Sequence, residues 1–168
     1  MIKIYISLSL ALACVFGSLL LTSCSAYYEE GKENLKFLYP DYVKCYVAQV
    51  IDGDTFDCQL SDVNIEKVRL IGIGIPESIG DTATNFSKSY LRRGTPVRLE
   101  LDEQTRDSDG RILAYVYLPG GKMLNALLIQ EGYAQVIINP SNIKYKDLFL
   151  KLETEAREQD RGMWKGKY

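Results

Sequence analysis

The 168-residue chain has no histidine and no surplus of positive charge. The first absence excludes any mechanism in which an imidazole serves as base, nucleophile or metal ligand. For the second, 20 lysines and arginines stand against 22 aspartates and glutamates, a net charge of −2 at pH 7. Proteins that hold nucleic acid by neutralising phosphates usually show a basic surplus. The composition therefore argues against tight non-specific binding to nucleic acid but leaves room for a small anion site.

The N-terminal residues are expected to be a targeting segment rather than part of the fold. Lys3 precedes a short apolar run from Ile4 to Leu21, which is typical of a secretory signal rather than a membrane-spanning helix. The run closes with Leu-Thr-Ser-Cys at 21–24, which resembles a bacterial lipobox. We expect a signal peptide over 1–23 and a Cys24 that carries two acyl chains, enough for stable anchoring of an exported lipoprotein in the cell envelope. The alternative is an ordinary signal peptide with a chance cysteine.

The rest of the chain divides into a polar linker and one domain. Residues 24–40 are polar and without a clear period, which predicts a tether. Residues 41–168 are enough for a single domain with one core. No internal repeat or low-complexity segment is present in the sequence.

Two cysteines, Cys45 and Cys58, remain in the domain. They lie on the apolar side of two predicted strands joined by an Asp-Gly turn at 52–53. If Ile51 pairs with Asp54, Cys45 faces position 60, so the two cysteines are diagonal neighbours. Diagonal pairs are usually too far apart for a relaxed disulfide, whereas an exported compartment favours oxidation and a bulge could close the gap. Two small reduced core residues is the preferred interpretation, and a disulfide stays open.

Strand-like and helix-like patterns alternate along the domain. The expected strands are 43–51, 56–60, 67–73, 96–101 and 112–118, and the expected helices are 81–93, 123–132 and 144–160. In the last helix Leu148, Leu152 and Ala156 recur every four residues and are expected to face the core. Five strands and three helices predict an α+β domain, most simply a small closed barrel with packed helices. Closure removes the sheet edges that an exported monomer would otherwise expose.

Several motifs resemble, in order, the thermonuclease (staphylococcal-nuclease-type) family. They are Val-Ile-Asp-Gly-Asp-Thr at 50–55, Val-Arg-Leu-Ile-Gly-Ile at 68–73, Pro-Glu at 76–77, Gly-Arg-Ile-Leu-Ala-Tyr at 110–115, Gly-Tyr-Ala at 132–134 and Arg-Gly-Met-Trp at 161–164, with an arginine at 106 before the fourth. Any one of them is weak, since an Asp-Gly turn is common in hairpins. Together they are specific, and the resemblance implies a five-stranded OB barrel with three helices.

The resemblance also implies a site. Asp54 matches the calcium-ligand aspartate, Arg69 and Arg106 match two phosphate-binding arginines, and Glu77 matches the glutamate assigned as base toward the attacking water. The chemistry is consistent, because a hard cation on a carboxylate polarises a phosphate and guanidinium forks neutralise its charge. Taken singly, these residues could instead finish a turn, cap a helix or form surface ion pairs.

The chain departs from the family pattern in two places. Most members carry an acid, the second direct calcium ligand, where this chain has Gly74. With one direct carboxylate, a calcium ion would be held weakly, mostly by water, backbone carbonyl and substrate phosphate. The segment 136–140 also lacks the base-stacking tyrosine that the family uses in this region.

Three functions remain open from the sequence. The preferred one is an exported, membrane-anchored nuclease that hydrolyses DNA or RNA phosphodiesters with a divalent cation, in the first place calcium. The second is a catalytically impaired OB-fold module that binds nucleic acid or an envelope protein. The third, the weakest, is a structural envelope lipoprotein with no anion site. Trp164 is expected to be structural, with its ring folded back onto the last helix.

Overall fold

The computed structural model describes residues 42–166. The predicted signal peptide (1–23), the lipidation site Cys24 and the predicted linker (24–40) therefore lie outside the described residues. Within 42–166, every helix is too short or too polar to cross a lipid bilayer.

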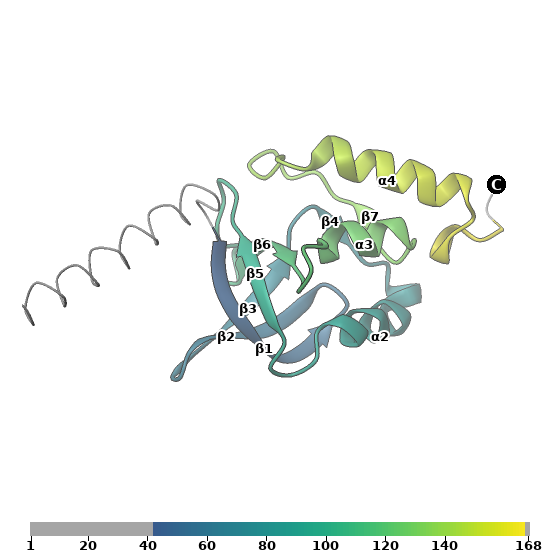
Figure 1. Cartoon of the computed structure of the whole chain (residues 1–168). Helices are drawn as coiled ribbons and strands as arrows, with labels where there is room; N and C mark the ends of the chain where they lie inside the picture. The colour runs from purple at the N-terminus through teal and green to yellow at the C-terminus, as the bar shows by residue number, and fades with distance from the viewer. Residues whose placement is uncertain (1–41, 167–168) are drawn as a thin grey trace, which may run out of the picture. The chain divides into compact units, whose positions relative to one another are not determined.

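Five strands close into a barrel, as the sequence predicts (Figure 1). They are β1 (Tyr42–Asp52), β2 (Thr55–Ser61), β3 (Asn64–Leu70), β5 (Pro96–Glu100) and β6 (Ile112–Tyr117). The order around the barrel is β1-β2-β3-β6-β5, and the β3–β6 pair is parallel while the other pairs are antiparallel. The parallel pair is what brings the start of β6 beside the arginine end of β3.

The third strand ends earlier than expected. A strand over 67–73 is predicted, but β3 stops at Leu70, and Ile73–Gly74 form a separate short strand, β4, that pairs with β7 (Gln135–Val136). Gly72 has a φ of +77°, a left-handed conformation that interrupts the extended chain and that glycine adopts without steric cost. A Cβ at Gly72 would also press on the ring of Phe149.

Three α-helices pack on the barrel, with α3 between the barrel and α4 (Figure 1). They are α2 (Gly80–Tyr90), α3 (Leu124–Gln130) and α4 (Lys146–Glu158), with the short 3₁₀ turns η1 (Glu77–Ile79) and η2 (Gly162–Trp164). The expected buried face of α4 is partly wrong, because Phe149 and Ala156 are buried whereas Leu148 is 42% exposed. The true face mixes steps of three and four residues, which follows the 3.6-residue turn better than a strict step of four.

Two buried polar groups fix the helices to the barrel. The amide of Asn125 in α3 is fully buried, accepts a hydrogen bond from the Val116 backbone N–H (2.9 Å) and donates to the Ile71 carbonyl (2.9 Å). The buried carboxylate of Glu100 pairs with Lys144 and accepts a hydrogen bond from the Tyr145 hydroxyl (2.8 Å) at the start of α4. Buried polar groups with satisfied partners fix one arrangement of the elements that carry them.

Trp164 packs as expected. Its side chain is 8% exposed, and the guanidinium of Arg157 on α4 lies 4.0 Å from the centre of its ring. The ring therefore closes the end of α4 by burial and by a cation–π contact.

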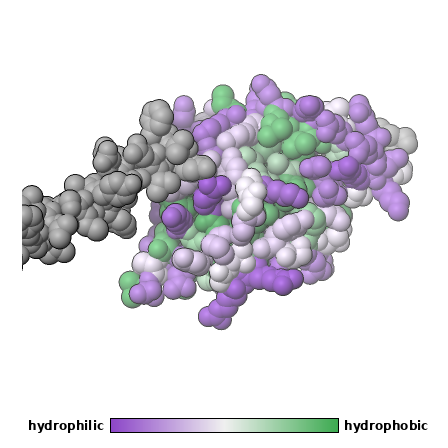
Figure 2. Space-filling model, in the orientation of Figure 1, coloured by the Kyte–Doolittle hydropathy of each residue, from purple (hydrophilic) through white to green (hydrophobic). Residues whose placement is uncertain are grey.

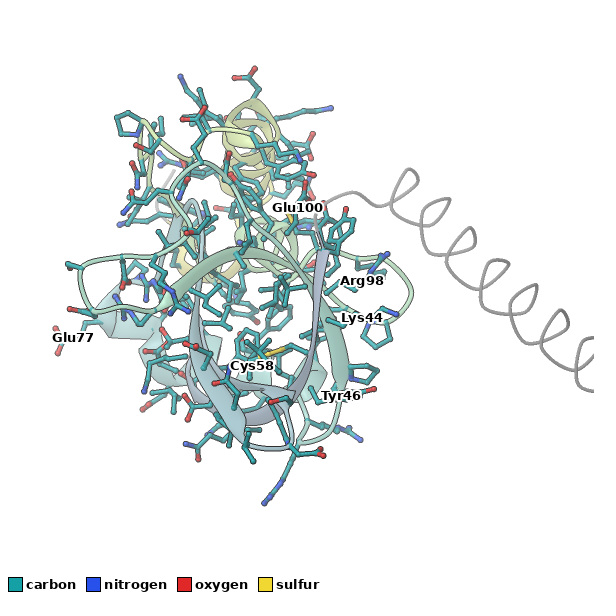
Figure 3. All side chains as sticks on the ribbon, turned by 90° about the vertical axis from the view of Figure 1, so that its left-hand side faces the viewer. Lys44, Tyr46, Cys58, Glu77, Arg98 and Glu100 are labelled. Carbon is teal, nitrogen blue, oxygen red and sulfur yellow. A yellow bond between two sulfur atoms is a disulfide. The ribbon has the colours of Figure 1, made fainter. Side chains whose placement is uncertain are left out.

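The preferred interpretation of the two cysteines is wrong. Tyr46 pairs with Gln59 and Val47 with Cys58, so Cys45 is the diagonal neighbour of Cys58, as the sequence suggested. A disulfide nevertheless joins the two cysteines between the neighbouring strands β1 and β2, with Cα atoms 5.8 Å apart (Figure 3). The strand irregularity between Val47 and Gln49 and the twist of a small barrel shorten the diagonal into the range that a disulfide spans.

Removing this disulfide is expected to destabilise the fold. The bond closes a loop with a sequence separation of 13 residues. Cross-linking a loop of that size reduces the conformational entropy of the unfolded chain and thereby raises its free energy by about 3 kcal/mol. Cys45→Ala/Cys58→Ala should therefore lose about that much free energy of unfolding, measured by urea denaturation. A reductant should destabilise the wild type equally and leave the double variant unchanged. Equal urea midpoints for the oxidised wild type and the variant would contradict the prediction.

Candidate active site

The β1–β2 turn places an acid where water barely reaches. The backbone N–H of Asp54 donates to Oδ1 of Asp52 (3.0 Å), a local hydrogen bond that favours the tight turn. From α2, the Ser87 hydroxyl donates to the Gly53 carbonyl (2.6 Å) and holds the turn against the helix. As a result, the Asp54 side chain is almost fully buried.

Arg69 of β3 reaches the Asp54 carboxylate because of strand register. Thr55 pairs with Arg69 across β2 and β3, so the arginine stands beside the head of β2. Its Nη1 donates to Oδ1 of Asp54, and the Thr55 hydroxyl donates to the same oxygen (3.1 Å). The guanidinium stays partly exposed, which leaves donors for an anion from outside.

Burial raises the pKa of the Asp54 carboxyl to about 6. The hydrogen bond and negative charge of Asp52 act in the same direction, whereas the positive charge of Arg69 and the Thr55 hydrogen bond oppose them. A carboxylate that is costly to ionise even beside an arginine is one that further positive charge would stabilise, as expected of a functional rather than a purely structural acid.

A cavity of about 600 Å³ opens above this pair. It brings together three of the residues expected in the site, Asp54, Arg69 and the exposed Glu77 at the start of η1. Asp52 and the α2 residues Asp81 and Lys88 line it too. Four carboxylates and two cations therefore share one open cavity.

The fourth expected residue, Arg106, is placed elsewhere. Its guanidinium makes two hydrogen bonds to the Glu66 carboxylate (3.0 and 3.2 Å) and one to the Gly110 carbonyl (2.5 Å). Among the residues described, those that line the cavity do not include it. The structure thus separates Arg106 from Asp54, Arg69 and Glu77.

Arg111, which the sequence analysis includes only as part of the motif at 110–115, is a further candidate for the site. Its pKa is raised mainly by the hydrogen bond to Asp107 (2.7 Å), and the negative charge of Asp54 contributes as well. From the sequence, Arg111 is seen only to precede a predicted strand. Its place relative to Arg69 depends on the parallel pairing of β6 with β3, in which Leu113 lies beside Arg69. The parallel pairing is a tertiary feature, which the local pattern does not reveal.

Gly74 occupies the position at which the family resemblance implies an acid, and Ile137 packs over it. Its φ is not in the positive range, so an acid is allowed there by the backbone. A Cβ at this position, however, would overlap Cδ1 of Ile137, the far end of a flexible side chain that must move aside. Ile75, the next residue, turns toward the cavity instead.

The donors present suit a hard cation that is held weakly. Carboxylate oxygens are the ligands that calcium and magnesium prefer, and Asp52, Asp54, Glu77 and Asp81 supply them at one cavity. Within residues 42–166, however, no three acidic or cysteine side chains converge as a preformed metal cluster. The chemistry of the donors fits calcium, and the number that converge is low for tight binding.

Comparison with known proteins assigns the family. The model of the family "Staphylococcal nuclease homologue" matches residues 67–166. The chain belongs to this family. It is 39% identical over 127 residues to a thermonuclease of Staphylococcus intermedius, covering 70% of this chain and 74% of that protein. It is 35% identical to a thermonuclease of Staphylococcus hyicus, with 70% and 73% covered. A prophage-derived endonuclease of Bacillus subtilis is 34% identical, with 74% of this chain and 45% of that protein covered.

The buried charge of Asp54 should be measurable as a cost to stability. Because the folded-state pKa is about 6 and the usual value is 3.8, the folded state holds its proton more tightly than the unfolded chain. This group therefore destabilises the fold as pH rises from about 4 to 6 and keeps doing so above that range. Compared with Asp54→Asn in a chelator, the wild type should lose up to about 3 kcal/mol over this window.

The measurement is urea unfolding at several pH values. Asp62→Asn, at an exposed acid in the β2–β3 turn, is the control for losing one negative charge. A constant difference between the wild type and Asp54→Asn from pH 4 to 8 would contradict the raised pKa.

Proposed function

We propose that this protein is a metal-dependent nuclease that hydrolyses phosphodiester bonds of DNA or RNA. The observation that carries the proposal is the convergence of Asp54, Arg69 and Glu77 on one open cavity of the barrel. Membership of the staphylococcal nuclease family and relatives named thermonuclease and endonuclease support it. A purely structural barrel has no need of a carboxylate that burial makes costly to ionise.

Each residue has a role that follows from its position. Arg69, held by Asp54 and still partly exposed, can donate to phosphate oxygens and neutralise charge as it builds on phosphorus. Glu77 is exposed on the cavity wall, so its carboxylate can take a proton from the water whose oxygen bonds to phosphorus. The leaving oxygen departs from the opposite side of the phosphorus.

A divalent cation, in the first place calcium, fits at Asp54, with Asp52 and Asp81 as the neighbouring donors. When bound, such an ion would polarise the phosphate and make the attacking water more acidic. The positive charge would also relieve the cost of ionising the buried Asp54 carboxyl. Because few donors converge, the substrate phosphate has to supply part of the ion's coordination.

We further propose that Arg111, rather than Arg106, is the second arginine of the site. The negative charge of Asp54 contributes to the raised pKa of Arg111, and Arg111 lies two residues before Leu113, the β6 partner of Arg69. Arg111 is paired with Asp107 and Asp109 and, among the residues described, is not part of the cavity lining. Arg106 is engaged by Glu66 and Gly110 outside the cavity.

The alternative is a catalytically impaired OB-fold module that binds nucleic acid or an envelope protein. The observation in its favour is Gly74 under Ile137, where most family members carry an acid. Under this alternative the protein binds oligonucleotides without cleaving them in any divalent metal.

Degradation of plasmid DNA and RNA in calcium, magnesium, manganese or chelator tests the proposal and ranks the residues. Glu77→Gln and Arg69→Ala should each lower turnover by about 100-fold or more, through loss of the base and of transition-state charge neutralisation. Arg111→Ala should behave like Arg69→Ala, whereas its matched control Arg106→Ala should keep most of the activity. Inactivity of Arg106→Ala with an active Arg111→Ala would reverse the assignment of the second arginine, and a wild type inactive in every metal would favour the alternative.

We also propose that the protein is exported and anchored in the cell envelope as a monomer, by a lipid on Cys24. The support is the apolar run at 4–21 and the lipobox-like ending at 21–24. Cys24→Ala should release or mislocalise the protein, and it should abolish incorporation of a labelled fatty acid. Labelling that persists in Cys24→Ala would contradict the anchor, and Cys14→Ala is the matched control.

A further inference from the structure

A second cavity, of about 370 Å³, lies on the outer wall of the barrel. It is formed by β1, β5 and the turn after β6, and its polar lining is Lys44, Tyr46, Arg98 and Tyr117. Figure 2 shows hydrophilic and apolar side chains mixed over the face of the barrel that carries β1 and β5. Figure 3 shows Lys44, Tyr46 and Arg98 on one side of the barrel and Glu77 on the opposite side. This second cavity is called the outer groove below. It is separate from the cavity lined by Asp54, Arg69 and Glu77, which is called the catalytic cavity below because of the proposed function.

Strand register places two cations side by side in the outer groove. Lys44 of β1 pairs directly with Arg98 of β5, while Cys45 and Val47 point into the barrel. Like charges at directly opposed positions of an antiparallel pair repel and destabilise the sheet. A phosphate between the two side chains would turn this repulsion into attraction.

Aromatic rings surround the two cations. The Arg98 guanidinium lies 5.0 Å from the centre of the Tyr42 ring and 5.8 Å from that of Tyr117, contacts that hold it along the wall. Tyr46 lies two residues after Lys44 on the same face of β1 and is 57% exposed. An exposed ring next to a pair of cations is the arrangement with which proteins bind single strands, by stacking a base and neutralising its phosphate.

The charge of the outer groove is the opposite of that of the catalytic cavity. Four carboxylates line the catalytic cavity, whereas the described residues that line the outer groove include none. The nearest acid along β5, Glu100, is buried and engaged by Lys144 and Tyr145. In a chain with a net charge of −2, a concave patch whose described lining has two cations and no acid favours an anionic ligand.

We propose that the outer groove binds single-stranded nucleic acid, with phosphates at Lys44 and Arg98 and a base stacked on Tyr46. The inference rests on the proposed nuclease function and adds a second contact for long substrates. Because the outer groove and Glu77 lie on opposite sides of the barrel, only a strand long enough to pass around the barrel reaches both. The groove retains such strands and leaves short ones unaffected.

Binding of a fluorescent single strand to the full-length protein, measured by anisotropy in a chelator, tests the proposal without turnover. A strand of about 30 nucleotides exceeds the roughly 4–16 nucleotides that one OB fold covers. Lys44→Gln/Tyr46→Ser should weaken binding by about 10-fold or more, since base stacking alone accounts for about a 5-fold effect or greater. Lys44→Gln alone should lower the slope of log affinity against log salt by about 0.7, the value for one phosphate contact on a single strand.

The matched control is Lys151→Gln, at an exposed lysine on α4, which should change neither the affinity nor the salt slope. In calcium, the double variant should raise KM for the long strand with kcat unchanged and should cleave a trinucleotide like the wild type. Both changed groove residues are exposed, so the thermal transition should stay in place and separate lost contact from lost fold.

If the double variant binds the long strand as tightly as the wild type does, the proposal that the outer groove binds nucleic acid is wrong, whether or not the protein cleaves nucleic acid. The groove is equally overturned if the double variant loses binding to phosphatidylglycerol vesicles but keeps its oligonucleotide affinity, because the patch is then a membrane contact. If the wild type neither binds nor cleaves any nucleic acid, the proposed function fails together with the groove. If the wild type and the double variant cleave long strands equally well, only the groove fails.

Discussion

The arrangement of the site depends on the buried contact between Asp54 and Arg69. Burying a carboxylate is costly, and leaving it without a cation is costlier still, so the contact is satisfied only when β2 and β3 pair in the register that joins Thr55 to Arg69. The same turn is held from α2 by Ser87. The ion pair and this hydrogen bond together tie the hairpin, the third strand and a helix, and Glu77 lines the cavity that opens above them.

The molecule separates its charges by face. Acids gather with Arg69 and Lys88 at the catalytic cavity, where the proposed function requires both a cation and a phosphate. Lys44 and Arg98 stand together at the outer groove, away from any lining acid among the residues described. Under the two proposals, a chain with net negative charge approaches a polyanion with one face and keeps, on another, the negative field that attracts a metal ion. The net charge of the chain alone indicates neither the acidic cavity nor the basic groove.

The barrel could be predicted from the sequence because its strands are marked by local alternation and by turn residues. What the sequence pattern missed depends on contacts between distant segments. The disulfide of Cys45 and Cys58 depends on barrel twist and a strand irregularity, and the end of β3 depends on the conformation of Gly72 against Phe149. Three of the expected site residues, Asp54, Arg69 and Glu77, line one cavity, and their motifs are local, at the turn, along β3 and just after it. The local pattern did not single out Arg111, because its place depends on the parallel pairing of β3 with β6.

The missing acid at position 74 can be understood from the same balance of charge. Burial and Asp52 already raise the pKa of Asp54, so another carboxylate nearby would make its ionisation costlier unless a cation were bound. Glycine at position 74 adds no such carboxylate; it is covered by Ile137 and is not among the described residues that line the cavity. Under the proposed function, less binding energy for the metal would come from the protein and more from the substrate phosphate. Such a site would reach its full charge balance only with metal and nucleic acid both bound, and the proposed strand contact at the outer groove would then matter more.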